Sequence, residues 1–176
     1  MAHTGDESKT TARPEFEELV DRFYRPLYQF AYSLSQTETE ASDLTQQTFY
    51  VWATKGHQLR DASKVKTWLF TTLHREFLKT RRRQSRFPHY EMSQVNAELP
   101  VISPMTVNRL DSAMVLQALA EVHEPYRAPL VLFYLEDNSY KEIAEILDIP
   151  IGTVQSRIAR AKVQLQQILM DKAPHG

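Results

Sequence analysis

The sequence predicts an all-α protein in which an extended linker joins two small helical domains. Apolar residues recur at steps of three and four on both sides of residues 84–109, which is the spacing of amphipathic helices. No stretch alternates strictly between polar and apolar residues over the length of a strand, and four glycines leave few sites for tight hairpins. Residues 84–109 lack helical spacing and contain three prolines, so we place a domain boundary there.

The N-terminal domain is expected over residues 14–86, after a polar and disordered tail at residues 1–13. Its first helix starts at Pro14, which is a favourable residue for a first helical turn. The apolar side of this helix begins with Phe16 and ends with Leu34. The spacing therefore predicts one long amphipathic helix at the start of the domain.

Two further helices are expected to complete this domain. A capping box at residues 37–40 opens the second helix, whose apolar side includes Leu44 and Val51. Residues 56–62 are interpreted as a loop. The third helix is expected over residues 63–83, with an end near the last of three successive arginines.

The C-terminal domain is expected over residues 110–172, beyond a flexible linker at residues 87–109. Its first helix lies near residues 113–120 and its second at residues 126–134. Most of the apolar residues of this second helix, Tyr134 among them, are expected to be buried.

The last two helices form the most specific pattern in the chain. A second capping box, at residues 139–142, opens a short helix that ends before a turn containing Pro150. The final helix carries Val154, Ile158 and Ala161 on its apolar side. A capped helix, a short turn and a second helix with divided faces are typical of a helix-turn-helix domain of the winged-helix-like kind.

Composition excludes several classes of protein. The chain has 21 Lys and Arg against 22 Asp and Glu, a formal net charge of −1, so it is not a uniformly basic protein of the histone type. It has no cysteine, which excludes disulfides, thiolate zinc sites and cysteine nucleophiles. Neither a signal peptide nor an apolar run of the roughly 18 residues that span a membrane is found. We therefore expect a soluble, cytoplasmic protein that does not insert into a membrane.

The charges are sorted by element. Eight basic residues accompany one acid between residues 64 and 86, whereas residues 15–61 and 111–148 each contain eight acids and fewer bases. Four of the cations fall at helical steps and form a stripe on one face of the third helix: Arg75, Lys79, Arg82 and Arg86. Such a stripe either keeps a helix soluble or binds nucleic acid. We expect the aromatic residues beside it to be core residues: Trp68, Phe70 and Phe77.

The outward face of the final helix suits the major groove of DNA. It carries Gln155, Ser156, Ala159 and Arg160, with further cations at its flanks. Arginine can pair with guanine and glutamine with adenine, while small side chains permit close approach of the helix. A helical hairpin with a merely soluble face leaves these small outward residues unexplained.

Two separate motifs resemble one known family. The segments SYKEIAEIL (139–147) and IPIGTVQSRIARA (149–161) closely resemble region 4 of extracytoplasmic-function (ECF) RNA polymerase sigma factors, of the sigma-70 family. The segment DLTQQTF (43–49) is similar to the polymerase-binding signature of region 2, and TWLF (67–70) to the start of its promoter-melting helix. The resemblance covers residues 16–169 in the order of the family.

The resemblance implies a non-catalytic subunit that binds core RNA polymerase and directs promoter-specific transcription initiation, without a cofactor or metal. It implies that region 2 docks on the clamp helices of the β′ subunit through one polar helix face: Asp43, Gln46, Gln47 and Tyr50. An anti-sigma factor is expected to cover the polymerase-binding and DNA-binding faces. In this reading residues 14–86 are region 2 and residues 110–172 are region 4.

The resemblance also implies two contacts with promoter DNA. In region 2 the −10 element is melted, a base flips into the loop at residues 55–63, and cations hold the backbone: Lys64, Lys66, Arg75, Lys79, Arg81, Arg82 and Arg83. In region 4 the final helix recognises the −35 element. Gln155, Ser156, Ala159 and Arg160 face bases there, and Thr153, Arg157 and Lys162 hold phosphates.

One alternative function stays open, a helix-turn-helix regulator that binds DNA but does not engage polymerase. An enzyme is not expected, because the histidines lack metal-ligand spacing and no nucleophile lies beside a base. The chain departs from the family at Asp148, where the turn usually has glycine, and at Gln155, where a cation is common. Aspartate tolerates the left-handed conformation, so we expect the turn to form.

Overall fold

The computed structural model describes residues 14–86, 114 and 117–173 of the chain. Within these ranges every regular element is a helix and none is a strand, which confirms the all-α class. The helix-turn-helix therefore has no β-hairpin wing among the described residues. The expected tail at residues 1–13 and the expected linker at residues 87–109 lie outside them.

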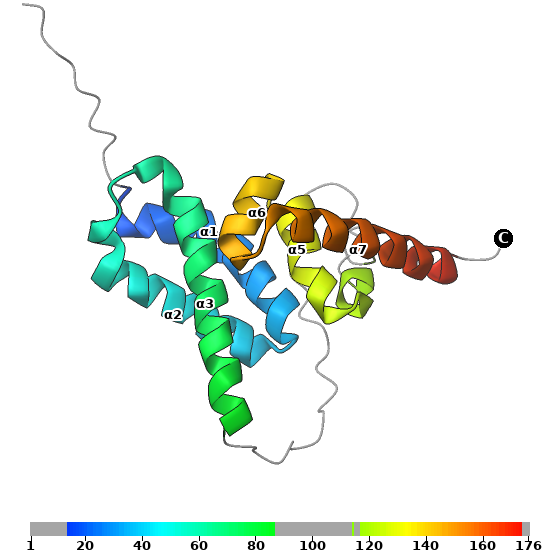
Figure 1. Ribbon diagram of the computed structural model, residues 1–176. Helices are drawn as coiled ribbons and strands as arrows, with labels where there is room; N and C mark the ends of the chain where they lie inside the picture. The colour runs from blue at the N-terminus through cyan, green and yellow to red at the C-terminus, as the bar shows by residue number, and fades with distance from the viewer. Residues whose placement is uncertain (1–13, 87–113, 115–116, 174–176) are drawn as a thin grey trace, which may run out of the picture.

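The helices fall into two halves of the sequence (Figure 1). The N-terminal half contains α1 (Phe16–Ser35), α2 (Glu38–Lys55) and α3 (Val65–Arg86). The C-terminal half starts with a helical stretch at residues 117–121 and continues with α5 (Glu124–Tyr134), α6 (Tyr140–Leu147) and α7 (Ile151–Lys172).

Helix α1 begins at Phe16, two residues later than expected from Pro14. Glu15 has an extended backbone (φ −60°, ψ 148°) and serves as the N-cap, so Pro14 precedes the helix. The helix ends at Gln36, where a left-handed φ of 61° lets the main-chain N–H bond to the carbonyl of Tyr32 at 2.8 Å. The expected apolar face is buried from Leu19 onwards.

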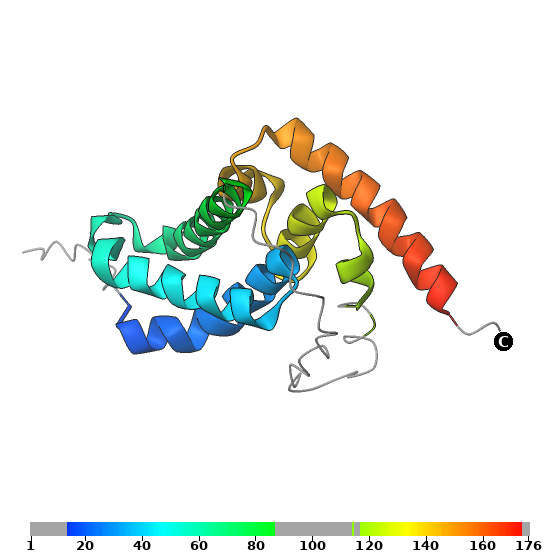
Figure 2. The same ribbon diagram turned by 90° about the horizontal axis from the view of Figure 1, so that it is seen from below.

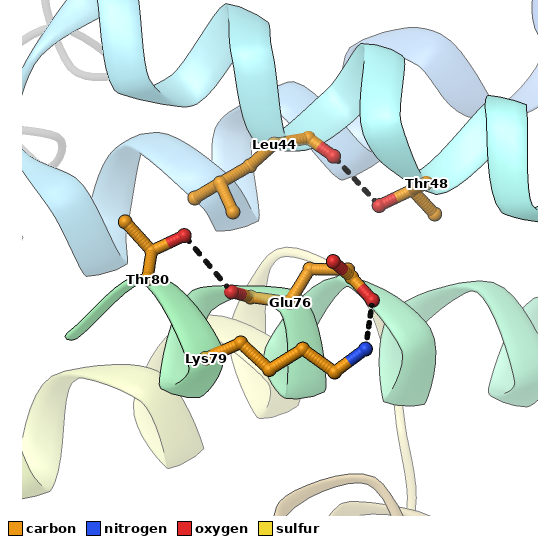
Figure 3. A network of polar contacts seen from close by, with 5 residues as sticks. All are labelled: Leu44, Thr48, Glu76, Lys79 and Thr80. Atoms are coloured by element: carbon orange, nitrogen blue, oxygen red, sulfur yellow. Dashed lines mark hydrogen bonds and ion pairs between the residues drawn. The ribbon is translucent and has the colours of Figure 1, made fainter. Parts of the chain in front are cut away.

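Helix α2 is capped by Thr37, whose hydroxyl accepts the main-chain N–H of Glu40. Only this one of the two bonds of the expected capping box forms. The Glu40 carboxylate accepts instead from the side-chain amide of Gln84 on α3. Val51 is half-buried, whereas two threonines enter the core. Thr48 donates its hydroxyl to the carbonyl of Leu44 at 2.7 Å (Figure 3), and Thr45 bonds one turn back in the same way. These bonds satisfy the buried hydroxyls.

Two short 3-10 turns, Gly56–Gln58 and Ala62–Lys64, occupy the expected loop. The Asp61 carboxylate accepts the N–H and the hydroxyl of Ser63, at 3.0 and 2.6 Å. This Asx-type cap holds residues 62–64 in a tighter turn, so α3 begins at Val65 rather than at residue 63. The helix continues to Arg86, three residues beyond the expected end.

The expected helix-turn-helix is present. Ser139 and Glu142 form both bonds of the capping box at the start of α6. Asp148 ends the helix with a φ of 53°, the left-handed conformation expected where the family has glycine. After the turn, Val154 and Ile158 of α7 are completely buried against the domain.

Tyr134 is the exception among the apolar residues of α5, since 54% of its surface is exposed. The prediction that it is buried is wrong: Tyr134 is the last residue of the helix, and from α7 the ammonium of the exposed Lys162 lies 5.9 Å from the centroid of its ring. Its ring instead packs edge-on against Phe133.

The two halves lie against each other. Helix α5 packs against α1, and α6 packs against α3 (Figures 1 and 2). Buried apolar side chains of both halves belong to one continuous core cluster. The structure shows that the N-terminal and C-terminal halves share an extensive contact. The domain boundary between them stays a prediction.

Candidate nucleic-acid and polymerase interfaces

The recognition helix α7 has the predicted division of faces. Val154, Ile158 and Ala161 are buried at helical steps of four and three. The side chains predicted to read bases are all exposed: Gln155, Ser156, Ala159 and Arg160. Of the predicted phosphate contacts, Lys162 is exposed, whereas Thr153 and Arg157 are half-buried. The packing of α7 therefore leaves the expected surface open to a ligand, while the role of each residue stays a prediction.

Two cations of α7 already have partners within the C-terminal half. The guanidinium of Arg160 donates to the hydroxyl of Tyr126 at 3.3 Å. The ammonium of Lys162 lies over the rings of Phe133 and Tyr134, at 5.3 and 5.9 Å from their centroids. The hydrogen bond of Arg160 is long and cation–π contacts at exposed sites are weak, so neither contact holds its side chain strongly.

Helix α3 presents the predicted cationic stripe. All four members of the stripe are exposed, as are Lys64, Arg81 and Arg83. Lys79 forms an ion pair with Glu76 at 2.8 Å (Figure 3). An exposed pair of this kind is worth about 1 kcal/mol or less, so it does not prevent Lys79 from binding a phosphate. As expected, Phe70 and Phe77 are core residues, and Trp68 is partly buried against the core.

Lys66 differs from the other predicted phosphate contacts of α3. It is half-buried, and its ammonium donates to the main-chain carbonyl of Glu136, which lies between α5 and α6. In this conformation the C-terminal half therefore binds the side chain of Lys66, which the sequence predicts to contact DNA phosphates.

The predicted polymerase-binding face of α2 is open to solvent. Its four members, Asp43, Gln46, Gln47 and Tyr50, are all exposed, and Tyr50 is 65% exposed. They lie opposite the side of α2 that buries Ala41, Thr45 and Thr48. The structure thus brings these four residues together on one surface.

Sequence reasoning missed an aromatic cluster beside this face. The buried ring of Phe49 on α2 stacks on Tyr24 and meets Phe16 edge-on, with centroids 6.3 Å apart in both cases. Phe16 is 47% exposed and Tyr24 is 41% exposed. Periodicity counted Phe16 as a core residue, and only the exposed position at the start of α1 shows that its ring covers Phe49 from outside.

Two ionisable side chains at the contact between the halves have strongly shifted pKa values. Burial raises the pKa of the Glu136 carboxyl to about 7, against the attraction of Lys66. Burial lowers the pKa of His74 on α3 to about 4, although the nearby Asp148 partly favours its charged form. At pH 7 His74 is therefore neutral, and the Glu136 carboxyl is about half protonated. Among the described residues, no group of three His, Asp or Glu side chains could hold a metal ion.

An exposed face on the second helix of the helix-turn-helix and a second helix of exposed cations are the features expected of a helical DNA-binding protein with two contact elements. Comparison with known families narrows this class. Residues 19–87 match the family "Sigma-70 region 2", and residues 112–165 match "Sigma-70, region 4". The chain belongs to the sigma-70 family of RNA polymerase sigma factors.

Individual relatives place the chain in the ECF group. It is 32% identical over 170 residues to the ECF RNA polymerase sigma factor SigE of Mycolicibacterium smegmatis, covering 94% of this chain and 65% of SigE. It is 28% identical to the ECF RNA polymerase sigma factor SigW of Bacillus subtilis, covering 89% of each chain. None of the helices in the described ranges is both long and apolar enough to cross a membrane.

Solved sigma factors share the arrangement of helices. The structure of the sigma factor RpoE in complex with the anti-sigma factor NepR, from Bartonella quintana, matches 90% of this chain and 98% of RpoE. The TM-score is 0.73 at 29% sequence identity. CnrH, in complex with the cytosolic domain of CnrY, matches 90% of this chain with a TM-score of 0.60 and 26% identity.

Proposed function

We propose that this chain binds core RNA polymerase through α2 and selects promoters through α3 and α7, as a non-catalytic specificity subunit acting in the cytoplasm. The observation that carries this proposal is the presence of both sigma-70 regions in one chain, each with its predicted contact face exposed. A regulator that binds DNA alone needs only the second of these regions.

Promoter recognition divides between the two halves. The exposed face of α7 inserts into the major groove of the −35 element, where Gln155 and Arg160 can each form paired hydrogen bonds with a base edge. The small side chains of Ser156 and Ala159 allow the helix to approach closely. The cations of α3 hold the phosphates of the separated −10 strand, and the loop at residues 55–63 receives an unstacked base.

An anti-sigma factor is the expected negative regulator. The two solved relatives are each in a complex, RpoE with the anti-sigma factor NepR and CnrH with the cytosolic domain of CnrY. We propose that a protein of this class covers the exposed faces of α2 and α7 in this chain as well. The exposed rings of Phe16 and Tyr24 beside the α2 face offer apolar area for such a partner.

Binding to core polymerase is the experiment that tests the proposal. The purified chain should form a complex with core polymerase and should support run-off transcription from a subset of a genomic promoter library. Asp43→Ala and Tyr50→Ala should weaken the complex with core polymerase but leave binding to −35 duplex DNA unchanged, since both residues lie on α2. Glu17→Ala, an exposed acid on α1, is the matched control.

A wild-type chain that binds duplex DNA but not core polymerase would contradict the proposal. That result would establish the alternative, a helix-turn-helix regulator that does not engage polymerase. Loss of both activities in Asp43→Ala would point to a folding defect, which circular dichroism of the variant distinguishes.

A further inference from the structure

The contact between the two halves contains a small set of specific polar bonds. Among the described residues, three hydrogen bonds cross from one half to the other, between residues 70, 84 and 94 positions apart. In each of them a side chain donates to a main-chain carbonyl. We call the region around these bonds and the apolar contacts beside them the seam.

The central member of the seam is Arg127 of α5. Its side chain is buried, and this burial lowers the pKa of its guanidinium. One terminal nitrogen donates to the carbonyl of Ser33 on α1 at 3.0 Å, and the other donates to the carbonyl of Val122 at 2.9 Å. The guanidinium thus bridges the two halves.

Arg127 supplies what the end of α1 lacks. The last four carbonyls of a helix have no intrahelical donor, and they carry the negative end of the helix dipole. Helix α1 has no basic residue in its own last turn, which includes Ser33. The cation that satisfies this helix end comes from the other half of the protein.

The remaining two bonds are donated by the N-terminal half to carbonyls that precede and follow Arg127 in the sequence. Gln36, the C-cap of α1, donates its amide to the carbonyl of Ala120 at 3.1 Å. Lys66 of α3 donates to the carbonyl of Glu136. Two of the three bonds therefore attach the end of α1, and the third occupies a cation of the DNA-binding helix.

The seam also brings acidic side chains of the C-terminal half near His74 and Lys66 of α3, although burial keeps His74 neutral at pH 7. Asp148 lies near His74 of α3, and the Glu136 carboxyl lies near Lys66. Both acids belong to the acid-rich stretch at residues 111–148, and both partners belong to the basic stretch at residues 64–86. Acidic residues of the C-terminal half therefore lie against the flank of the helix that is assigned to promoter phosphates.

We propose that the seam is an autoinhibitory latch: it holds the free protein closed with Lys66 occupied by the C-terminal half, and it must open before α3 can engage the −10 strand. This inference rests on the function proposed above. In the closed state the faces of α7 and α2 stay exposed, so the −35 duplex and polymerase can bind first and the −10 strand competes with the Glu136 carbonyl for Lys66. The latch thereby links opening to the presence of promoter DNA.

A distance measurement on the full chain tests the latch. The sequence has no cysteine, so Thr39→Cys on α2 and Gln167→Cys on α7, both at exposed positions, give a unique pair of labelling sites. Pulsed electron-spin resonance between nitroxides at these sites should show one narrow distance distribution for the free protein. Core polymerase with promoter DNA should convert it into a longer distance.

Two substitutions should loosen the latch. Arg127→Lys keeps the charge but replaces the two donor nitrogens that reach the two carbonyls by a single one, and it should raise the ratio of open to closed molecules about tenfold. Gln36→Ala removes an exposed bond and should raise this ratio about threefold without affecting folding of either half. Arg25→Lys, at an exposed position on α1, is the matched control and should leave the distribution unchanged.

A broad distance distribution in the free wild-type protein would overturn the latch. So would distributions for Arg127→Lys and Gln36→Ala that equal that of Arg25→Lys, and the Gln36 variant decides the matter if the Arg127 variant does not fold. Run-off transcription separates this result from the fate of the proposed function. A chain that initiates transcription but is open when free refutes the latch alone, whereas a closed chain that opens with Arg127→Lys and never binds polymerase refutes the proposed function.

Discussion

Replacing Glu136 by glutamine should change how the stability of the protein depends on pH. The folded state raises the pKa of this carboxyl from its ordinary 4.5 to about 7, because its side chain is only 6% exposed. A raised carboxyl pKa means that the folded state prefers the protonated form. The energetic penalty is therefore absent below pH 4.5, grows between pH 4.5 and 7, and is complete above pH 7.

The magnitude follows from the two pKa values. The interval from 4.5 to about 7 corresponds to about 3 kcal/mol when the carboxyl is fully ionised. Only one oxygen of Glu136, Oε1, is buried without a hydrogen-bond partner. A glutamine has nearly the same shape as a glutamate and can place its neutral carbonyl there. Glu136→Gln should therefore raise the free energy of unfolding by about 3 kcal/mol at pH 8 and by about 1 kcal/mol at pH 5.

His74 opposes this dependence in the wild-type protein. Its pKa falls from 6.5 to about 4 on folding, so its burial is unfavourable only as the pH drops below 6.5, by about 2 kcal/mol at pH 5. Between pH 8 and pH 5 the penalty of Glu136 declines while that of His74 increases by a similar amount. In Glu136→Gln the free energy of unfolding should therefore decrease as the pH falls, because of His74. In His74→Gln it should increase as the pH falls, because of Glu136.

Urea unfolding at pH 5 and pH 8, followed by circular dichroism, measures these differences. Glu145→Gln, on an exposed part of α6, is the matched control and should change the free energy of unfolding little at either pH. If the stability gain of Glu136→Gln is the same at both pH values, the carboxyl does not ionise in the folded protein in this range. A loss of stability at pH 8 would show that the amide lacks a partner, and Glu136→Met should then show the gain.

Four further substitutions test local packing and DNA contacts. Gly56→Ala should destabilise the protein by about 1–3 kcal/mol, because its Cβ would lie 2.6 Å from the Trp52 ring. Gly152→Ala in α7 meets no atom within 4 Å and should stabilise the protein by about 0.5–1 kcal/mol. Equal melting temperatures for the two variants would refute this account of the packing. Arg160→Ala should weaken binding by about 1–3 kcal/mol at one −35 position only, and equal losses on all sequences would reduce Arg160 to a phosphate contact. Arg82→Ala should lower the slope of log affinity against log salt by about one, and an unchanged slope would remove it from the DNA path.

The helix-turn-helix could be predicted from the sequence because local rules determine it. The capping box at Ser139 and the left-handed turn at Asp148 need only neighbouring residues, and both occur as expected. The start of α3 was misplaced, although the signal was also local: the Asp61 side chain caps Ser63 and favours a tighter turn over an α-helix. Tyr134 was misplaced for a different reason, since spacing alone does not show where a helix stops being enclosed.

The contact faces were predicted as sets of residues on helix surfaces, and this is the part that periodicity determines well. A helix that buries Val154 and Ile158 must turn Gln155 and Ala159 outward. The fate of Lys66 could not be predicted in this way. Its partner is a main-chain carbonyl 70 residues away, and a carbonyl leaves no mark in the sequence.

Helix α5 does carry a sign of the seam that the sequence analysis overlooked. Its residues from Arg127 to Leu132 are all buried, although a helix on the surface of a small domain exposes about half of its circumference. A segment that is apolar on every side, as in APLVL (128–132), must be enclosed on every side. Helices α6 and α7 cover only part of α5, and α1 of the other half covers another part. The apolar circumference of α5 thus required a partner outside the helix-turn-helix, and α1 is that partner. Arg127, the one cation among these buried residues of α5, donates to a carbonyl near the end of α1, where main-chain carbonyls lack intrahelical donors.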